Sequence, residues 1–266
     1  MCTIIALRGV HPAYPLIVAA NRDEFTSRRA TGPVVLSQSP RVAGGLDRQA
    51  QGTWLGVTEG GFFVGITNQR TWGMPDSTRR SRGALVLDAL RLGSVDAVAS
   101  HLEALAPRTF NPFNLLFGDA ASLAVAYVRD DAPEVTVERL PAGMHVLTND
   151  RMGSPWFPKA ELPNAMIELD ALPSMDLDGV FAAMLPVLGD HSIPRAIPPP
   201  PRGSLMPAAY ARRLQALCVH TPGYGTVSAT LLAVSHSGVA RYLFAEGPPC
   251  RTAFVDHTGL LATPSR

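Results

Sequence analysis

The sequence predicts an α+β protein in which antiparallel strands and helices form separate layers. Two observations lead to this prediction. Short runs rich in Val, Ile, Leu and Thr, bounded by Gly or Pro, come in blocks, and stretches of helical periodicity separate the blocks. In addition, 266 residues with 46% hydrophobic content suffice for one large core. This order favours layers over a doubly wound parallel sheet, and we expect a single domain over residues 1–266.

The expected elements follow in chain order. Apolar, β-branched runs predict strands at 2–7, 16–20, 53–57, 62–67, 113–117, 123–128, 135–140, 144–148, 227–234 and 239–244. Helical spacing of apolar residues predicts helices at 83–92, 95–105, 159–169, 177–188 and 207–217. The Pro-rich stretch 193–207 contains four consecutive prolines, which exclude helix and central strand. We favour an extended connection there over a lid across a site.

Composition narrows the class of partner. The net charge is +1 and no segment concentrates Lys or Arg, so we expect a small-molecule ligand and no nucleic acid. The first apolar run is interrupted at Arg8, and no later stretch approaches the roughly 18 apolar residues of a membrane span. Three cysteines are too few for a disulfide scaffold and indicate a reducing compartment. These observations predict a cytoplasmic protein without membrane insertion and leave its oligomeric state open.

The common cofactor, metal and hydrolase signatures are missing. Lys159 is the only lysine and does not lie in a P-loop, and His-Glu-x-x-His and Gly-x-Ser-x-Gly do not occur. The cysteines lack the paired spacing of a zinc site, and the seven histidines show no ligand spacing. We therefore expect no metal site and no required cofactor.

The N-terminal segment MCTIIALRGVHPAYPLIVAANRDEF predicts a hairpin that ends in a polar cluster. Gly9 and the prolines that follow mark the turn, so Arg8 faces Leu16 in an antiparallel pair. Counting back along both strands places Cys2 opposite Arg22 and beside Asp23. The hairpin register therefore brings the N-terminus and the polar cluster together.

This juxtaposition suits nucleophilic catalysis. Methionine aminopeptidases remove Met1 when a residue as small as cysteine follows, which would give Cys2 a free α-amino group. An unperturbed α-amine has a pKa of about 8, and a cysteine thiol has a pKa of about 8.5. Because both groups titrate close to neutral pH, the amine can take the proton of the thiol, and one residue can supply both nucleophile and general base. Arg22 and Asp23 would orient the amine. The alternative is a small buried Cys2 beside a solvated ion-paired turn.

Several further motifs carry a resemblance to a known family. They are Met-Cys at the start, AANRDEF, GTWLG, ITNQ, SRG, NPFNLL, LTND followed by PWFPK, and PGYGT. Their identity and order resemble the NRDE family, which is the family of transport and Golgi organisation protein 2. That family resembles the N-terminal nucleophile (Ntn) hydrolases. The resemblance implies a four-layer αββα sandwich, with two antiparallel sheets between helical layers.

The resemblance also implies residue roles, by analogy with choloylglycine hydrolases and penicillin V acylase. Cys2 would be nucleophile and base, and Asp23 would hydrogen-bond its amine. Asn149 and Asn68, each at the end of an expected strand, would donate to an oxyanion, although Asn is also common in turns. Those hydrolases carry an Arg three residues before the hairpin Asp, where this chain has Ala20, and it is open whether Arg22 substitutes for that Arg.

A second departure is Val227, because an Arg usually follows PGYGT in the family. We expect the substrate-binding residues to include Asn21, Trp54, Trp156, Lys159 and Tyr224. For the two Trp residues, packing in the core or at a helix start is the alternative. A Lys at a helix N-terminus is electrostatically disfavoured, which indicates a nearby anion or Asp150.

Three functions fit these observations. The first is an amidase, acylase or thioesterase that cleaves a small acyl substrate through Cys2 after removal of Met1. The second, implied by the resemblance, is a carrier or trafficking protein for haem or acyl-CoA on the same fold, in which the Cys2 thiolate would bind haem iron. The third is a scaffold whose contact surfaces the sequence does not mark.

Overall fold

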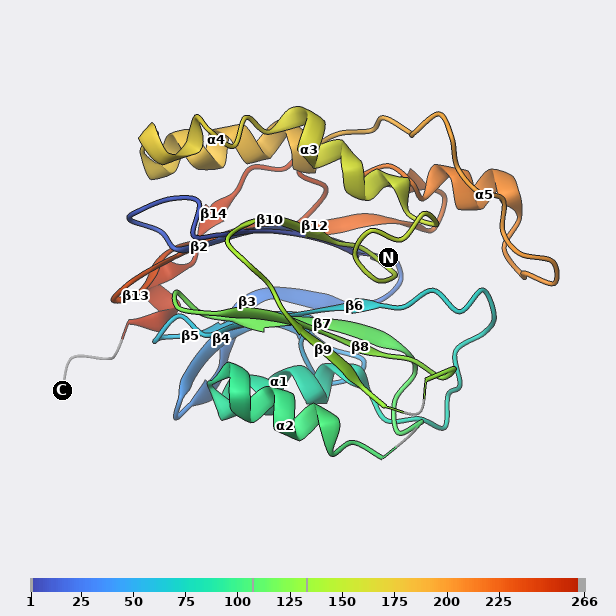
Figure 1. The fold of residues 1–266 in the computed structure, drawn as a ribbon, viewed down its shortest axis with the longest axis horizontal. Coiled ribbons are helices and arrows are strands. Elements are labelled where there is room, and N and C mark those ends of the chain that lie inside the picture. Colours follow the sequence, from blue (N-terminus) through green and yellow to red (C-terminus); the bar gives the residue numbers. More distant parts are fainter. Residues whose placement is uncertain (1, 107, 133, 263–266) are drawn as a thin grey trace.

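Two antiparallel sheets stacked face to face form the centre of the protein, and helices cover their outer faces (Figure 1). The structure is a computed structural model that describes residues 2–106, 108–132 and 134–262. Within these residues each sheet has seven strands. The arrangement is the expected α+β sandwich with four layers.

The first sheet contains the N-terminal hairpin at its centre. Its order is β10-β1-β2-β12-β13-β14, and β11 also pairs with β12. The strand bounds are β1 Cys2–Arg8, β2 Leu16–Phe25, β10 Gly143–Leu147, β11 His220–Thr221, β12 Tyr224–Ser235, β13 Gly238–Ala245 and β14 Val255–Asp256. Because β1 and β2 have partners on both sides, the hairpin is held by hydrogen bonds on both edges.

The second sheet follows the chain order β3-β4-β5-β6-β7-β8-β9. Its strands are β3 Ala30–Gln38, β4 Arg41–Asp47, β5 Leu55–Thr58, β6 Phe63–Asn68, β7 Phe113–Gly118, β8 Leu123–Val128 and β9 Thr136–Arg139. The helix pair lies between β6 and β7 in the chain, so the second sheet carries its own helical cover.

The helices lie on the two outer faces, with α3 and α4 beside the first sheet and α1 and α2 beside the second (Figure 1). The α-helices are α1 Arg82–Leu92, α2 Val95–Glu103, α3 Leu162–Met166, α4 Leu177–Leu188 and α5 Ala208–Arg213. Short 3₁₀ turns are η1 Pro158–Glu161, η2 Leu172–Ser174 and η3 Thr258–Leu261. The side chain of Asp176 caps α4 by accepting a hydrogen bond from the Gly179 amide at 2.8 Å. None of the helices in the described ranges has the length and apolar character needed to cross a bilayer.

Alternating side chains of β1 explain the layering. Ile4 and Ala6 point into the core between the sheets, where Phe63 also packs. Ile5 and Leu7 point the other way, into the core beneath α4. A strand buried on both faces must lie inside the protein, and this is why an almost continuously apolar run starts the chain.

Most predicted elements are confirmed, whereas strands β3 and β4 and the two-residue strands β11 and β14 were missed, and the predicted helix 207–217 is reduced to α5. β4 contains Gly44 and Gly45, which lower β propensity. Gly44 faces the backbone of β5, where a Cβ would lie 2.5 Å from the Leu55 carbonyl oxygen, whereas a Cβ at Gly45 would overlap the Trp54 ring. The predicted helix 159–169 is instead the turn η1 followed by the short helix α3. Residues 205–207, at the end of the Pro-rich stretch, line a cavity, so this stretch is more than a connection.

The close strand contact at Gly44 gives a first testable prediction. Gly44→Ala should destabilise the protein by about 1–3 kcal/mol, because backbone atoms of β5 cannot move away from the new methyl group. Gly60→Ala is the matched control, since the nearest atom to its Cβ would be 3.8 Å away, and it should stay within about 0.5 kcal/mol. Chemical denaturation measures both, and equal stability of the two variants would contradict the packing described here.

Candidate functional site

The N-terminal hairpin has the register that the sequence predicts. Arg8 pairs with Leu16 and Cys2 pairs with Arg22, so Cys2 lies beside Asp23 at the open end of the hairpin. Cys2 is partly exposed and lines a cavity of about 500 Å³ together with Arg22 and Asp23. The predicted nucleophile therefore has access to a space large enough for a substrate.

The Asp23 carboxylate is fully buried and held on both oxygens. Thr226 donates its hydroxyl to Oδ1 at 2.6 Å, and Lys159 Nζ lies 3.8 Å from Oδ2. Tyr224 donates its hydroxyl to the backbone carbonyl of Asp23 at 3.0 Å. These contacts come from β12 and η1, so two distant parts of the chain fix the position of Asp23 on β2.

Burial dominates the electrostatics of this ion pair. Desolvation raises the pKa of Asp23, and the charge of Lys159 and the Thr226 hydroxyl partly oppose this rise. Desolvation likewise lowers the pKa of Lys159, against the attraction of Asp23. The charge of Asp23 and the charge of Lys159 stabilise each other against the cost of desolvation. Removing one of the two side chains would leave the other as a buried charge without a partner of opposite sign.

Burial also raises the pKa of the Cys2 thiol. The negative charge of Asp23 acts in the same direction, whereas the Asp23 backbone amide and the Arg22 guanidinium lower it. The thiol therefore stays protonated near neutral pH, and its activation would need a base that takes the proton during the reaction.

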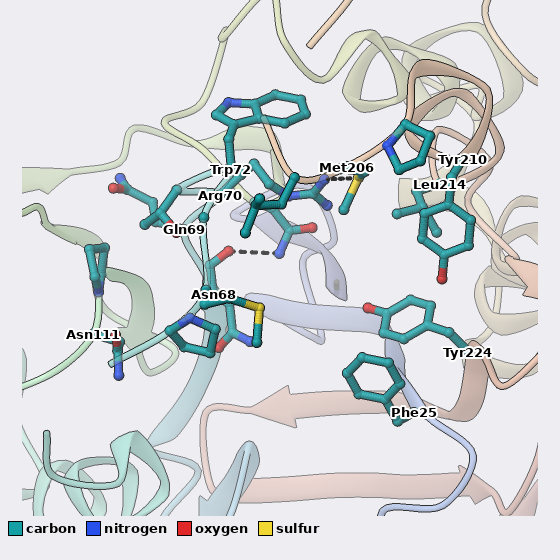
Figure 2. A pocket seen from close by; sticks show the side chains of 18 of the residues that line it. Phe25, Asn68, Gln69, Arg70, Trp72, Asn111, Met206, Tyr210, Leu214 and Tyr224 are labelled. Atoms are coloured by element: carbon teal, nitrogen blue, oxygen red, sulfur yellow. Dashed lines mark hydrogen bonds between the residues drawn. The ribbon is translucent and has the colours of Figure 1, made fainter. Parts of the chain in front are cut away.

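Asn149 and Asn68 lie against each other at the ends of β10 and β6. Asn149 donates from Nδ2 to the Asn68 carbonyl oxygen at 2.7 Å (Figure 2). The β1–β10 register pairs Ile4 with Leu147, and continuing it by two residues brings Asn149 level with Cys2. Asn68 and Cys2 line the same cavity. Asn149 and Arg22 thus flank Cys2 on opposite sides.

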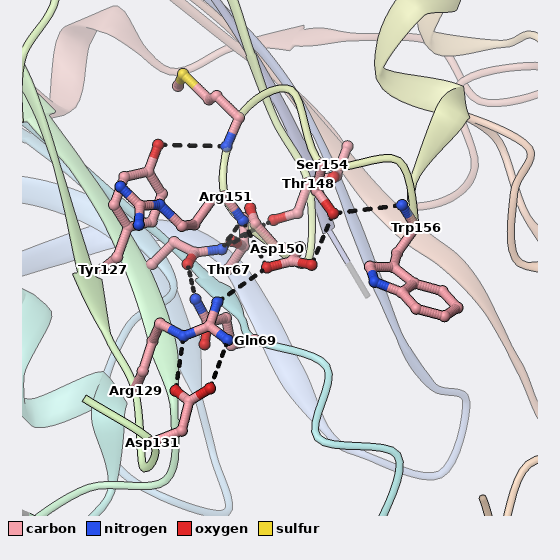
Figure 3. Close-up of polar contacts among 12 residues, drawn as sticks. Thr67, Gln69, Tyr127, Arg129, Asp131, Thr148, Asp150, Arg151, Ser154 and Trp156 are labelled. Atoms are coloured by element: carbon pink, nitrogen blue, oxygen red, sulfur yellow. Dashed lines mark hydrogen bonds and ion pairs between the residues drawn. The ribbon is translucent and has the colours of Figure 1, made fainter. Parts of the chain in front are cut away.

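A polar network fixes the turn that follows Asn149 (Figure 3). Asp150 accepts hydrogen bonds from the Ser154 hydroxyl at 2.7 Å and the Arg151 amide at 2.8 Å, and Arg129 lies 3.4 Å away. The anion next to Lys159 is therefore Asp23, whereas the sequence also allowed Asp150. Lys159 is also completely buried in η1 and does not project towards a substrate from a helix start.

Arg22 places its charge over the Trp54 ring, with Cζ 4.3 Å from the ring centroid. It also lies 3.8 Å from a carboxylate oxygen of Glu24. Trp54 lines the same cavity as Cys2, while part of its ring packs in the core. A cation therefore borders the site from position 22, while positions 20 and 227, where the resemblance led us to expect Arg, carry Ala20 and Val227.

A second cavity, also of about 500 Å³, adjoins the first and is largely apolar (Figure 2). The two cavities share Asn68, Pro75, Arg82 and Asn111. The apolar side chains that line the second cavity are Phe25, Trp72, Met74, Pro75, Pro112, Leu205, Met206, Pro207, Tyr210, Leu214 and Tyr224. The first cavity is lined by charged residues, Arg22, Asp23, Glu24, Arg28, Asp47, Asp76, Arg79, Arg80 and Arg82 among them. Asn68 lies where the two join.

Three predicted binding residues line neither of the two large cavities: Asn21, Trp156 and Lys159. Asn21 donates both amide hydrogens to backbone carbonyls, of Leu188 at 2.8 Å and Leu217 at 3.0 Å, so it bridges two segments of the fold, and it also lines a small pocket beside Cys2. Trp156 packs edge-on against Trp72, with ring centroids 5.9 Å apart, and of these two rings only Trp72 lines the apolar cavity.

The fold also assembles a group of residues that the sequence spacing did not predict. His191, Cys218, His220 and Cys250 each offer a ligand atom, and these four atoms lie within 4.8 Å of one another. The spacing of cysteines and histidines in the sequence did not indicate this group, because three distant segments supply its members. The pair Cys218 and His220, separated by one residue, was the only local signal.

The buried ion pair gives a second prediction. Lys159→Met should destabilise the protein by about 3–5 kcal/mol, because Asp23 would remain buried without its cation. The double variant with Asp23→Asn should recover most of this loss, since it removes both charges. Arg139→Met, in an exposed ion pair with Asp96, is the control and should cost at most about 1 kcal/mol. Denaturant titration measures all three, and equal losses for Lys159→Met and the control would refute the role of the pair.

The fold is similar to solved structures of Ntn hydrolases. A conjugated bile acid hydrolase from Clostridium perfringens superposes with a TM-score of 0.57 at 13% identity, over 98% of this chain and 94% of that one. Penicillin V acylase from Agrobacterium tumefaciens gives 0.54 at 14% identity, over 97% and 86%. An N-acylethanolamine-hydrolysing acid amidase from Caenorhabditis elegans gives 0.51 at 12%, over 87% and 92%. At these identities the similarity establishes the Ntn-hydrolase fold alone.

Sequence comparison is more specific. The profile of the family described as Transport and Golgi organisation 2 matches residues 1–246. The human Transport and Golgi organization protein 2 homolog is 31% identical over 246 residues, covering 85% of this chain and 84% of that protein. The mouse homolog is 29% identical over 248 residues with the same coverage. The chain therefore belongs to the Transport and Golgi organisation 2 family.

Proposed function

We propose that the chain, acting as one domain over residues 1–266, is a cysteine hydrolase that cleaves an amide or thioester of a small acyl compound. The observation that carries the proposal is the position of Cys2. It pairs with Arg22, lies beside the buried Asp23 and borders a cavity. The solved neighbours, named as a hydrolase, an amidase and an acylase, support this choice of reaction.

In the proposed reaction, removal of Met1 exposes the α-amine of Cys2. The thiol sulfur attacks the substrate carbonyl carbon while its proton passes to that amine. This transfer is needed because burial keeps the thiol protonated. The ammonium then protonates the departing amine or thiol, which leaves a thioester on Cys2. Water hydrolyses that thioester and releases the acid.

Asp23 is a positioning residue in this scheme. Thr226 and Lys159 hold its carboxylate, which would hydrogen-bond the α-amine and keep the lone pair of the amine directed at the thiol. Asn149 and Asn68 would stabilise the oxyanion. Asn149 uses one amide hydrogen on the Asn68 carbonyl, and an amide carries a second.

The two joined cavities suggest how a substrate would lie. The apolar cavity, with Tyr224 and Phe25 on one side and Met206 on another, suits the acyl chain. The charged cavity beyond Asn68 would receive the polar leaving group, close to Arg22. The scissile carbonyl would then sit at the junction, within reach of Cys2.

A second candidate function rests on the apolar cavity itself. The cavity has a volume of about 500 Å³, and Arg70 and Arg82 lie in its lining beside the apolar side chains. This combination suits an amphipathic ligand such as haem or acyl-CoA, which the protein would bind without converting it. Burial lowers the pKa of Arg70 to about 10, so its guanidinium stays charged near neutral pH. In this alternative the haem iron would lie towards the charged cavity, which Cys2 lines, and the Cys2 thiolate would bind it there.

The hydrolase proposal predicts selective reactivity of Cys2. Intact mass of the purified protein should show that Met1 is absent, and brief alkylation near neutral pH should label Cys2 before Cys218 and Cys250, because the freed α-amine of Cys2 can take up the proton of its own thiol. Cys2→Ala should lose this rapid labelling and leave the slower labelling of Cys250, which is exposed, unaffected. Retained Met1 together with a slow Cys2 would argue decisively against hydrolysis.

A haem titration separates the two candidates. If the hydrolase proposal is right, haem added to the wild-type protein and haem added to Cys2→Ala should give the same absorbance spectrum. A haem spectrum that the wild-type protein gives and Cys2→Ala loses, with Cys250→Ala as the control that keeps it, would favour the carrier.

A further inference from the structure

We propose that His191, Cys218, His220 and Cys250 form a tetrahedral zinc site, separate from the site of the proposed reaction. The four side chains come from the segment after α4, the start of β11, and the turn between β13 and β14. None of the four lines either of the two large cavities. The proposal stands independently of the proposed hydrolysis.

The donor set fits zinc. Two thiolates with two imidazoles are a common tetrahedral set for structural Zn²⁺. With Zn–S near 2.3 Å and Zn–N near 2.0–2.1 Å, a tetrahedron puts sulfur and nitrogen about 3.6 Å apart. In the structure His220 Nε2 lies 3.7 Å from Cys218 Sγ and 3.3 Å from Cys250 Sγ. The widest separation in the group is at most 4.8 Å, so a shift of about 1 Å, within the range of side-chain rotation, completes the geometry.

The hydrogen bond made by His191 prepares it as a ligand. Its Nδ1 lies 2.9 Å from the carbonyl oxygen of Cys218. Because a carbonyl only accepts hydrogen bonds, Nδ1 carries the proton, and Nε2 carries the lone pair that a metal would use. A histidine ligand whose other nitrogen donates to a backbone carbonyl is the usual outer-shell arrangement at metal sites.

The backbone holds the three segments together. The Cys218 amide donates to the Asp190 carbonyl at 2.8 Å, which ties the strand segment to the end of α4. A Cβ at Gly189 would lie 3.5 Å from Cys250 Cα, so the turn that carries Cys250 packs directly against the C-terminal end of α4. The ligands therefore have a common framework that does not depend on long side chains.

The position of the site suggests what zinc would do. His191 and Cys218 stand at the two ends of the long connection from α4 through α5 (Figure 1). That connection carries Met206, Tyr210 and Leu214, which line the apolar cavity. Asn21 already joins the same two ends through the Leu188 and Leu217 carbonyls. Zinc would join the two ends of the connection at a second point and would restrict the motion of the cavity wall that the connection forms.

Metal titration of the reduced, full-length protein tests the proposal. After chelator treatment, Co²⁺ should bind with one-to-one stoichiometry and give the strong visible bands of tetrahedral cobalt together with thiolate charge-transfer absorption. Zn²⁺ should displace it, raise the melting temperature as a ligand of the native state does, and protect Cys218 and Cys250 from alkylation. Cys250→Ser and His191→Ala should lose the cobalt spectrum, while Cys2→Ala should keep it.

Several outcomes would overturn the proposal. One is a folded, reduced protein that gives no cobalt spectrum, or only the weak absorption of octahedral cobalt on surface oxygens. Another is a spectrum that persists in Cys250→Ser and His191→Ala, both of which replace exposed side chains and so should fold. A third is a purified protein in which Cys218 and Cys250 form a disulfide that resists reduction, since oxidised sulfurs cannot bind zinc.

Discussion

The pairing of β1 with β2 at the centre of the first sheet is the constraint on which the candidate site depends. Because both strands have hydrogen-bonded neighbours on their outer edges, their register cannot slip without disrupting β10 and β12 as well. That register places Cys2 across from Arg22. The same strands bury side chains on both faces, so the packing of two cores fixes the position of Cys2, the proposed nucleophile.

The buried pair of Asp23 and Lys159 adds an electrostatic constraint. A carboxylate taken out of water costs several kcal/mol, and Lys159 and Thr226 offset that cost in place of solvent. The arrangement keeps Asp23 next to Cys2 without exposing it to the charged cavity as a free anion. A chain that uses arginine at every other cationic position keeps its single lysine at this buried contact.

Hydrophobic periodicity and the hairpin count predicted the layered fold and the place of Cys2 and Asp23, because both depend on local pattern. Local sequence pattern could not identify Asp23 as the partner of Lys159, because the two residues lie far apart in the chain and meet only through packing. Strand β4 was missed because its glycines are required by contacts between distant residues, with the β5 backbone at Gly44 and the Trp54 ring at Gly45, and local propensity does not report such contacts. The apolar cavity was not predicted either, because its walls come from segments that are spread along the chain between Phe25 and Tyr224. The group that contains His191 and Cys250 was not predicted for the same reason, since its members lie far apart in the chain.

The central claim is that Cys2 forms a covalent acyl intermediate. Its most direct test is to incubate the processed protein with a small activated acyl thioester, quench with acid, and locate any added acyl mass by peptide mapping. The account predicts an acyl group on Cys2 that accumulates in an Asn149→Ala variant more slowly than in the wild type and is absent from Cys2→Ala. No acyl group on Cys2, or equal acylation of Cys2 and Cys250, would contradict it.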